Sequence, residues 1–66
     1  MDITVNGKSR TVPDGITAGA LIERLELTGK RLAMEVNGEI LPKSRHASHA
    51  LTPGDRIEIV HAVGGG

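Results

Sequence analysis

The sequence predicts a small α+β domain in which one main helix packs on one face of a small mixed sheet. Three observations support this fold class. Two Asn-Gly dipeptides, Asn6-Gly7 and Asn37-Gly38, each separate two strand-like segments, and Asn-Gly favours the tight turn of a β-hairpin. One stripe of apolar residues with helical spacing lies between the two hairpins. The longest alternating apolar run comes last, at residues 56–63.

The first hairpin is predicted from the segments on either side of Asn6-Gly7. Ile3 and Val5 are separated by one polar residue, so they share one face of a strand. A type I′ turn needs a positive φ at both central residues, and Asn followed by Gly tolerates this conformation. Residues 8–12 contain few apolar side chains. They predict a short return strand with much of one face in water.

The helix is predicted to begin after Thr17, whose hydroxyl can accept a hydrogen bond from a free amide of the first turn. Ile16 and Leu21 stand at the positions of a hydrophobic staple, which fixes the angle at which the chain enters the helix. Leu21 and Leu25 belong to one apolar stripe. Gly29 is predicted to end the helix, because glycine readily adopts the left-handed conformation of a C-terminal cap.

A second hairpin and a polar connector complete the predicted elements before the last strand. Residues 32–36 alternate in polarity, Asn37-Gly38 provides the turn, and residues 39–41 return. Residues 43–50 are polar and predict a loop or a single helical turn.

The run from residue 56 to residue 63 predicts the central strand, because it is the longest and its Ile57 and Ile59 would lie beneath the helix. Val60 and Ala62 fall on the opposite face of this strand. Two interpretations of that face stay open. Either the polar connector covers it, or its apolar side chains are exposed as a contact surface for another protein.

The composition excludes several classes of function. The 66 residues allow one small domain, in which eight Lys and Arg balance eight Asp and Glu, and there is no Phe, Tyr, Trp or Cys. Nucleic-acid binders normally have a basic excess, and single-strand binders stack bases on aromatic rings. His46 and His49 alone do not complete a zinc site and are expected to lie in solvent. No apolar run approaches the roughly 18 residues of a membrane span. We therefore expect a cytoplasmic protein with no metal, no nucleic-acid partner and no membrane contact.

The most informative feature is the terminal Gly64-Gly65-Gly66. It divides the chain into a folded domain, residues 1–63, and a flexible glycine tail, residues 64–66. Glycine has no Cβ, so an extended glycine tail is the thinnest peptide that can enter a narrow channel. The Gly66 carboxylate could then reach a reactive centre on another protein. Composition alone also allows a frayed terminus or an expression remnant.

Taken together, these segments resemble the ThiS family of ubiquitin-like β-grasp sulfur carriers of thiamine biosynthesis. The resemblance covers essentially the whole chain, and its most specific part is Gly-Asp-Arg-Ile-Glu-Ile-Val running into Ala-Val-Gly-Gly-Gly. Many relatives have an aromatic residue where this chain has His46. The segments that carry the resemblance are residues 3–7, 21–27, 35–42 and 51–66.

The resemblance implies a carrier protein rather than an enzyme, with no cofactor of its own. An E1-like adenylating enzyme would activate the Gly66 carboxylate with ATP. A persulfide donor would convert the adenylate to a thiocarboxylate, and thiazole synthase would accept its sulfur to build the thiazole ring of thiamine. The residues implied in partner binding are Val60, Ala62, Val63, Gly64 and Gly65.

Three alternatives stay open beside this interpretation. The small subunit of molybdopterin synthase uses the same terminal chemistry for a different acceptor, although its chains are usually longer. A ubiquitin-like modifier would form isopeptide bonds with lysines. A non-covalent interaction module would function without the terminal glycines.

Overall fold

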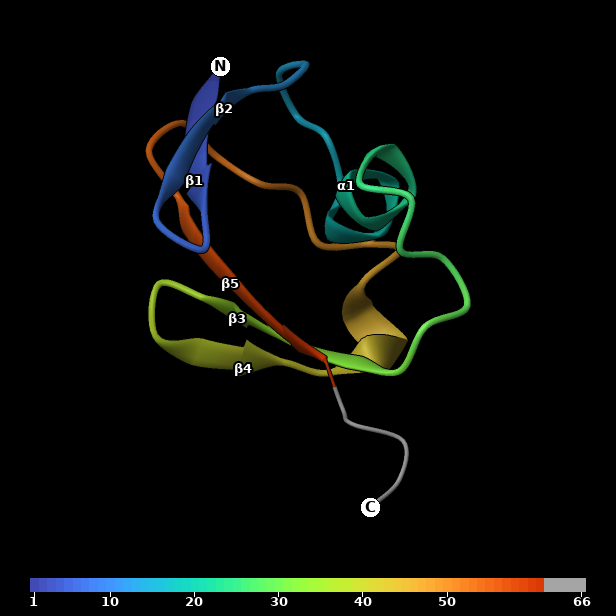
Figure 1. Cartoon of the computed structure of the whole chain (residues 1–66). Helices are drawn as coiled ribbons and strands as arrows, with labels where there is room; N and C mark the ends of the chain where they lie inside the picture. The colour runs from blue at the N-terminus through green and yellow to red at the C-terminus, as the bar shows by residue number, and fades with distance from the viewer. Residues whose placement is uncertain (62–66) are drawn as a thin grey trace.

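The computed structural model describes residues 1–61 of the chain. Within this range the chain forms two hairpins, one main helix, a short 3-10 helix and a last strand (Figure 1). In chain order these are β1 (Asp2–Val5), β2 (Lys8–Thr11), α1 (Ala18–Arg24), β3 (Leu32–Val36), β4 (Glu39–Leu41), the 3-10 helix η1 (Lys43–Arg45) and β5 (Arg56–His61).

The sheet has the strand order β2-β1-β5-β3-β4, with β5 in the middle. β1 and β5 run parallel, whereas the other neighbouring strands are antiparallel, so the sheet is mixed. The predicted α+β class and the central position of the last strand are confirmed. β2 is exposed at all four residues, which agrees with the low apolar content of that segment.

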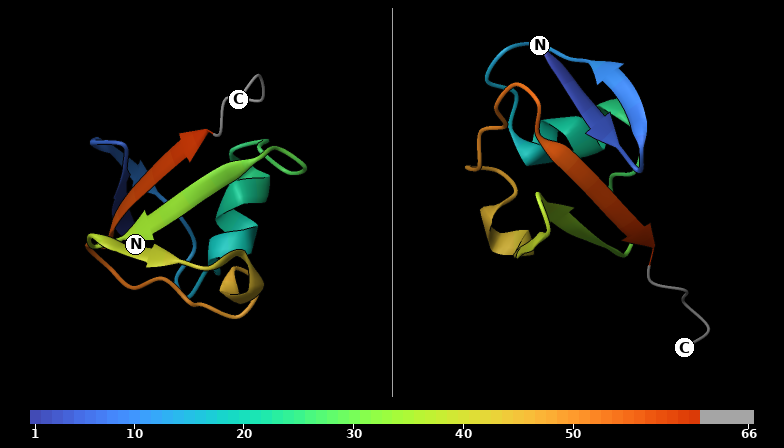
Figure 2. Two further views of the ribbon diagram at one scale, coloured as in Figure 1. Left: turned by 90° about the horizontal axis from the view of Figure 1, so that it is seen from below. Right: turned by 90° about the vertical axis from the view of Figure 1, so that its left-hand side faces the viewer.

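Helix α1 covers one face of the sheet, and the core lies between the two layers (Figure 2). Ile3 and Val5, predicted to share a strand face, are both buried, as are Ile57 and Ile59. Each aliphatic side chain buried in this way contributes roughly 1.5–3 kcal/mol to folding. The largest fully buried side chains are Ile3, Leu21, Met34, Leu51 and Ile57.

The first turn of α1 is capped by its own N-cap residue and by the connector before β5. The Ala20 N–H donates to the hydroxyl of Thr17, as predicted, over 3.1 Å. The N–H groups of Ala18 and Gly19 donate to the carbonyl oxygens of His49 and His46, over 2.9 and 2.7 Å. These amides would otherwise lack partners.

This packing brings the backbone of the connector close to Gly19 and buries a histidine. A Cβ added at Gly19 would lie 3.3 Å from the carbonyl oxygen of His46. The His46 side chain is only 9% exposed, and its Nε2 lies 3.1 Å from the carbonyl oxygen of Leu41. The expectation that His46 lies in solvent is therefore wrong. Its ring packs inside because the connector folds back against α1.

The helix ends at a left-handed glutamate rather than at the predicted glycine. Glu26 has a φ of 59°, and its N–H donates to the carbonyl of Glu23, while the N–H of Leu27 donates to Ile22. This pair of bonds is the Schellman motif. Leu27 and Ile22 both pack against the core, which is the apolar contact that accompanies the motif. The prediction of a C-terminal cap at Gly29 is wrong, because Gly29 belongs to the following turn.

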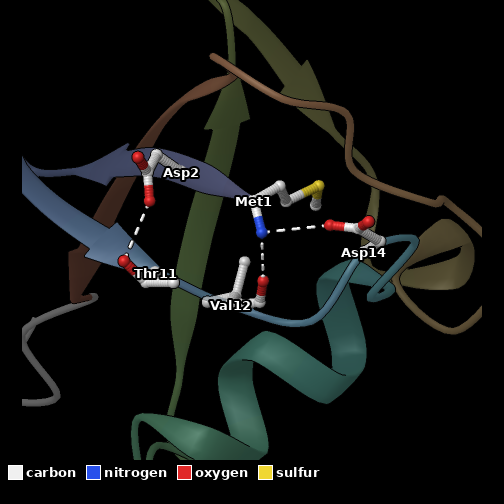
Figure 3. A network of polar contacts seen from close by, with 5 residues as sticks. All are labelled: Met1, Asp2, Thr11, Val12 and Asp14. Atoms are coloured by element: carbon white, nitrogen blue, oxygen red, sulfur yellow. Dashed lines mark hydrogen bonds and ion pairs between the residues drawn. The ribbon is translucent and has the colours of Figure 1, made fainter.

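A small polar network joins the start of the chain to the turn before α1 (Figure 3). The Met1 ammonium donates to the carbonyl of Val12 over 2.7 Å and lies 3.0 Å from a carboxylate oxygen of Asp14. Beside it, the Thr11 hydroxyl donates to the Asp2 carboxylate over 2.8 Å. The network therefore fixes the open end of the first hairpin.

We expect Glu26→Gly to stabilise the domain by about 1 kcal/mol, because it removes the cost of a left-handed non-glycine residue. Urea denaturation monitored by circular dichroism measures the change. Glu23→Gly is the matched control, since Glu23 lies within α1, where glycine costs about 1 kcal/mol. Equal destabilisation by both substitutions would contradict the argument.

Candidate functional site

The candidate site is the end of β5, where the chain runs on toward the predicted glycine tail. His61, the last described residue, is paired with Leu32 on β3. The predicted site residues Ala62, Val63, Gly64, Gly65 and Gly66 lie outside the described residues, as does the predicted boundary between domain and tail. What the structure does describe is the strand and the surfaces beside it.

One side of β5 is held by the asparagine of the first hairpin turn. Asn6 and Gly7 have the predicted positive φ values, 51° and 81°. The Asn6 amide nitrogen donates to the carbonyl of Ile59 over 3.2 Å, and its amide oxygen accepts from the Ile59 N–H over 2.8 Å. The Asn6 backbone N–H donates to Ile57. The side-chain amide thus continues the pairing of β1 with β5 beyond the last residue of β1.

The other side of β5 is held by the second turn in a related way. Asn37 has a φ of 53°, and its N–H donates to the carbonyl of Arg56 over 2.8 Å. Its amide oxygen accepts from the Arg56 N–H over 2.9 Å, and its amide nitrogen donates to Asp55 over 3.0 Å. The two Val-Asn-Gly turns, at residues 5–7 and 36–38, therefore form hydrogen bonds to opposite sides of β5.

Asp55 is a buried carboxylate that organises the turn leading into β5. It accepts hydrogen bonds from the Thr52 N–H over 2.8 Å, the Thr52 hydroxyl over 2.9 Å and the Asn37 amide. Burial raises the pKa of Asp55. The hydrogen bonds from Thr52 and Asn37 and the charge of His49 together lower it by more, so its net pKa lies below the usual 3.8.

Helix α1 leaves the opposite face of the sheet uncovered (Figure 2). Two apolar side chains on that face are exposed. Val60 is 59% exposed and Ile40 is 73% exposed, so the interpretation in which the connector covers Val60 is wrong. The connector packs against α1, on the other side of the sheet. Val60 and Ile40 are not direct neighbours on this face: Ile40 is paired with Glu35, which is paired in turn with Glu58, whereas Val60 is paired with Ala33. We call Val60 and Ile40 the open-face patch.

The exposure of Ile40 on the open face was not predicted from the sequence. Ile40 belongs to a strand of only three residues, which is too short for alternating polarity to show which face each side chain occupies. The register of β4 shows which face Ile40 occupies. Leu41 pairs with the buried Met34, so Ile40, which precedes Leu41, faces the other side of the sheet.

Within residues 1–61, no three His, Cys, Asp or Glu side chains are grouped so that they could hold a metal ion. His49 is half-buried and His61 is exposed. In the same part of the chain, no helix is long and apolar enough to cross a membrane.

A model of the ThiS family matches residues 3–66, a range that includes β5 and the three terminal glycines. The chain belongs to the ThiS family. The crystal structure of the thiamine biosynthesis protein ThiS from Geobacter metallireducens superimposes with a TM-score of 0.86, at 30% identity and with full coverage of both chains. The match confirms the predicted ubiquitin-like β-grasp fold.

Similar curated proteins include a sulfur carrier of the same length and segments of much longer proteins. The sulfur carrier protein ThiS of Escherichia coli (strain K12) is 29% identical over 66 residues, the full length of both chains. Proteins named thiazole synthase from Paramagnetospirillum magneticum and Magnetococcus marinus are 39% and 30% identical over the same 66 residues. The ThiS-family chain spans only 20% of the length of each synthase.

We expect Asp55→Asn to lower the free energy of unfolding by about 2 kcal/mol near neutral pH, because charge-assisted hydrogen bonds are lost. The pKa of Asp55 is lowered by folding, so its charge stabilises the fold above the unfolded pKa of 3.8. That contribution is lost as the pH falls through the folded pKa.

The difference between the wild type and Asp55→Asn should therefore shrink as the pH is taken below 3.8. Urea denaturation over an acid pH series measures it, with the exposed Glu39→Gln as control. A difference that does not change with pH would show that the charge of Asp55 is unimportant.

Proposed function

We propose that this protein is a sulfur carrier of thiamine biosynthesis that carries sulfur as a thiocarboxylate on Gly66. The observation that carries the proposal is the family match through residue 66, together with the absence of any Cys to hold sulfur elsewhere. The full-length relative from Escherichia coli is named a sulfur carrier protein. The protein is then a co-substrate that other enzymes act on, and it needs no cofactor of its own.

The proposed chemistry begins by activating a poor electrophile. An E1-like adenylating enzyme lets the Gly66 carboxylate attack the α-phosphorus of ATP, and pyrophosphate leaves. The terminal sulfur of a persulfide donor then attacks the acyl carbon and displaces AMP, which gives an acyl disulfide. A thiol cleaves the S–S bond by exchange and leaves the thiocarboxylate on Gly66. ATP is consumed by the partner enzyme.

The proposed role of the fold is to present the tail from a fixed strand. Two asparagine turns hold β5 by main-chain and side-chain bonds, and Gly64 and Gly65 would leave clearance in a narrow enzyme channel. The exposure of Val60, and of Ile40 on the same face, supports a docking surface for the partner enzymes on the open face of the sheet. Ala62 and Val63 would extend that surface toward the glycines.

Thiazole synthase is the acceptor we propose for the sulfur. Its support is that two proteins of that name contain a segment similar to all 66 residues of this chain. When a carrier and its acceptor are parts of one polypeptide, the effective concentration of the carrier at the acceptor is high. We place the carrier, the adenylating enzyme and the synthase together in the cytoplasm.

We expect incubation with the adenylating enzyme, ATP and a persulfide source to exchange one oxygen of Gly66 for sulfur. Intact mass spectrometry detects the exchange, and peptide mapping assigns it to the C-terminal peptide. A chain without Gly66 should show almost no sulfur transfer to thiazole synthase, since the activated carboxylate would be displaced by one residue. Its thermal unfolding should be unchanged.

The outcomes of this assay separate the alternatives. Full transfer by a folded chain lacking Gly66 would refute the proposal. Lysine conjugates in place of a thiocarboxylate would indicate a ubiquitin-like modifier, and transfer to a molybdopterin precursor rather than to thiazole synthase would indicate the other sulfur-carrier pathway.

We expect Val60→Asp to weaken binding to the adenylating enzyme about tenfold, because it places a charge in an apolar contact. Steady-state kinetics of the adenylating enzyme should show a raised KM for the carrier. The fold of the variant should be unchanged, because Val60 is exposed. Ser9→Asp, on exposed β2, is the matched control. An unchanged KM for Val60→Asp would remove the open-face patch from the docking surface.

A further inference from the structure

A groove lies between α1, the loop before β3 and the connector around η1. Its volume is about 780 Å³, and the side chains lining it include Ile22, Leu27 and Leu32. These three apolar side chains pack against the core but stay only half-buried. The paired residues Ala33 and Val60 also border the groove, although alternation with the buried Ile57 and Ile59 turns the Val60 side chain to the opposite face of the sheet. The groove therefore reaches β5 one residue before the last described position.

The groove has a basic border. Lys30, Arg31 and Lys43 line it and are exposed. Among residues 1–61, none of these three cations forms a salt bridge, and Glu23 is the one acidic residue that lines the groove. The whole chain has a formal net charge of zero, so this excess of positive charge is local.

An apolar floor beside exposed cations is complementary to a ligand that has both apolar and negatively charged groups. Half-buried aliphatic side chains gain from burial against another apolar group. Exposed cations attract carboxylates and favour the partner whose charge is opposite. A ligand with both properties is a peptide segment in which acidic and aliphatic residues alternate.

We propose that this groove docks an acidic segment of a partner protein. An aliphatic side chain of the segment would pack on Ile22, Leu27 and Leu32, and its carboxylates would contact the three cations at the border. That the partner is one of the two enzymes named above rests on the proposed function. The proposal that the groove docks an acidic segment rests only on the charge and shape of the groove, and not on the proposed function.

The first test is an NMR titration of the full-length, ¹⁵N-labelled chain with the peptide acetyl-Asp-Leu-Glu-Leu-amide. The matched probe is acetyl-Asn-Leu-Gln-Leu-amide, which has the same shape without charge. We expect the acidic peptide alone to shift the amide signals of Ile22, Leu27 and Leu32, and added salt to weaken the effect. Equal shifts with both peptides, shifts confined to Ile40 and its neighbours on β4 or no shifts would overturn the proposal.

The second test reverses charge at the groove. The double variant Lys30→Glu with Lys43→Glu should bind the acidic peptide about tenfold more weakly. Lys8→Glu with Arg10→Glu makes the same charge change on exposed β2 and should leave binding unchanged. All four side chains are exposed, and circular dichroism checks that both variants stay folded. Equal losses in both variants would reduce the effect to net charge and overturn the assignment of the groove.

Neither binding measurement uses the partner enzymes, ATP or a sulfur donor. Failure of the groove proposal therefore leaves the thiocarboxylate assay untouched, and failure of that assay leaves the groove measurement valid.

Discussion

The position of β5 depends on two asparagine side chains that each perform two tasks. A type I′ turn needs a residue that tolerates a positive φ, and the edge of β5 needs a donor and acceptor beyond the end of the neighbouring strand. Asn6 and Asn37 meet both needs, because the amide of each offers hydrogen bonds that resemble those of a backbone. A glycine could make either turn and keep the backbone bond to β5, but it has no side-chain amide to add the other bonds. These bonds fix β5 on both of its sides within the sheet.

Local features of the sequence predicted most of the fold, because they depend on neighbours along the chain. Alternation placed Ile57 and Ile59 in the core, and the hydroxyl of Thr17 capped the helix as expected. The end of the helix was missed because Glu26 adopts a strained conformation that lets Leu27 reach the core. Packing outweighed local preference there.

Features that depend on distant contacts could not be derived from the same patterns. His46 resembles a solvated residue in sequence, and its burial follows from hydrogen bonds between the connector and the first turn of α1. The open face is partly predictable, since alternation placed Val60 opposite Ile57, while the exposure of Ile40 depends on the register of a very short strand. The groove was not predictable, as it joins residues from α1, η1 and the loop before β3.

The parallel pairing of β1 with β5 has a consequence for the synthesis of the protein. Asn6 and Ile59 are 53 residues apart in sequence, yet they exchange two hydrogen bonds. The middle strand of the sheet is the last of the described strands to leave the ribosome, so the two hairpins have no shared partner until then. Cotranslational folding stops short of a complete core, and closure of the sheet is a late, cooperative event limited by contacts distant in sequence. A nascent chain therefore presents no finished docking surface to an enzyme before β5 has emerged.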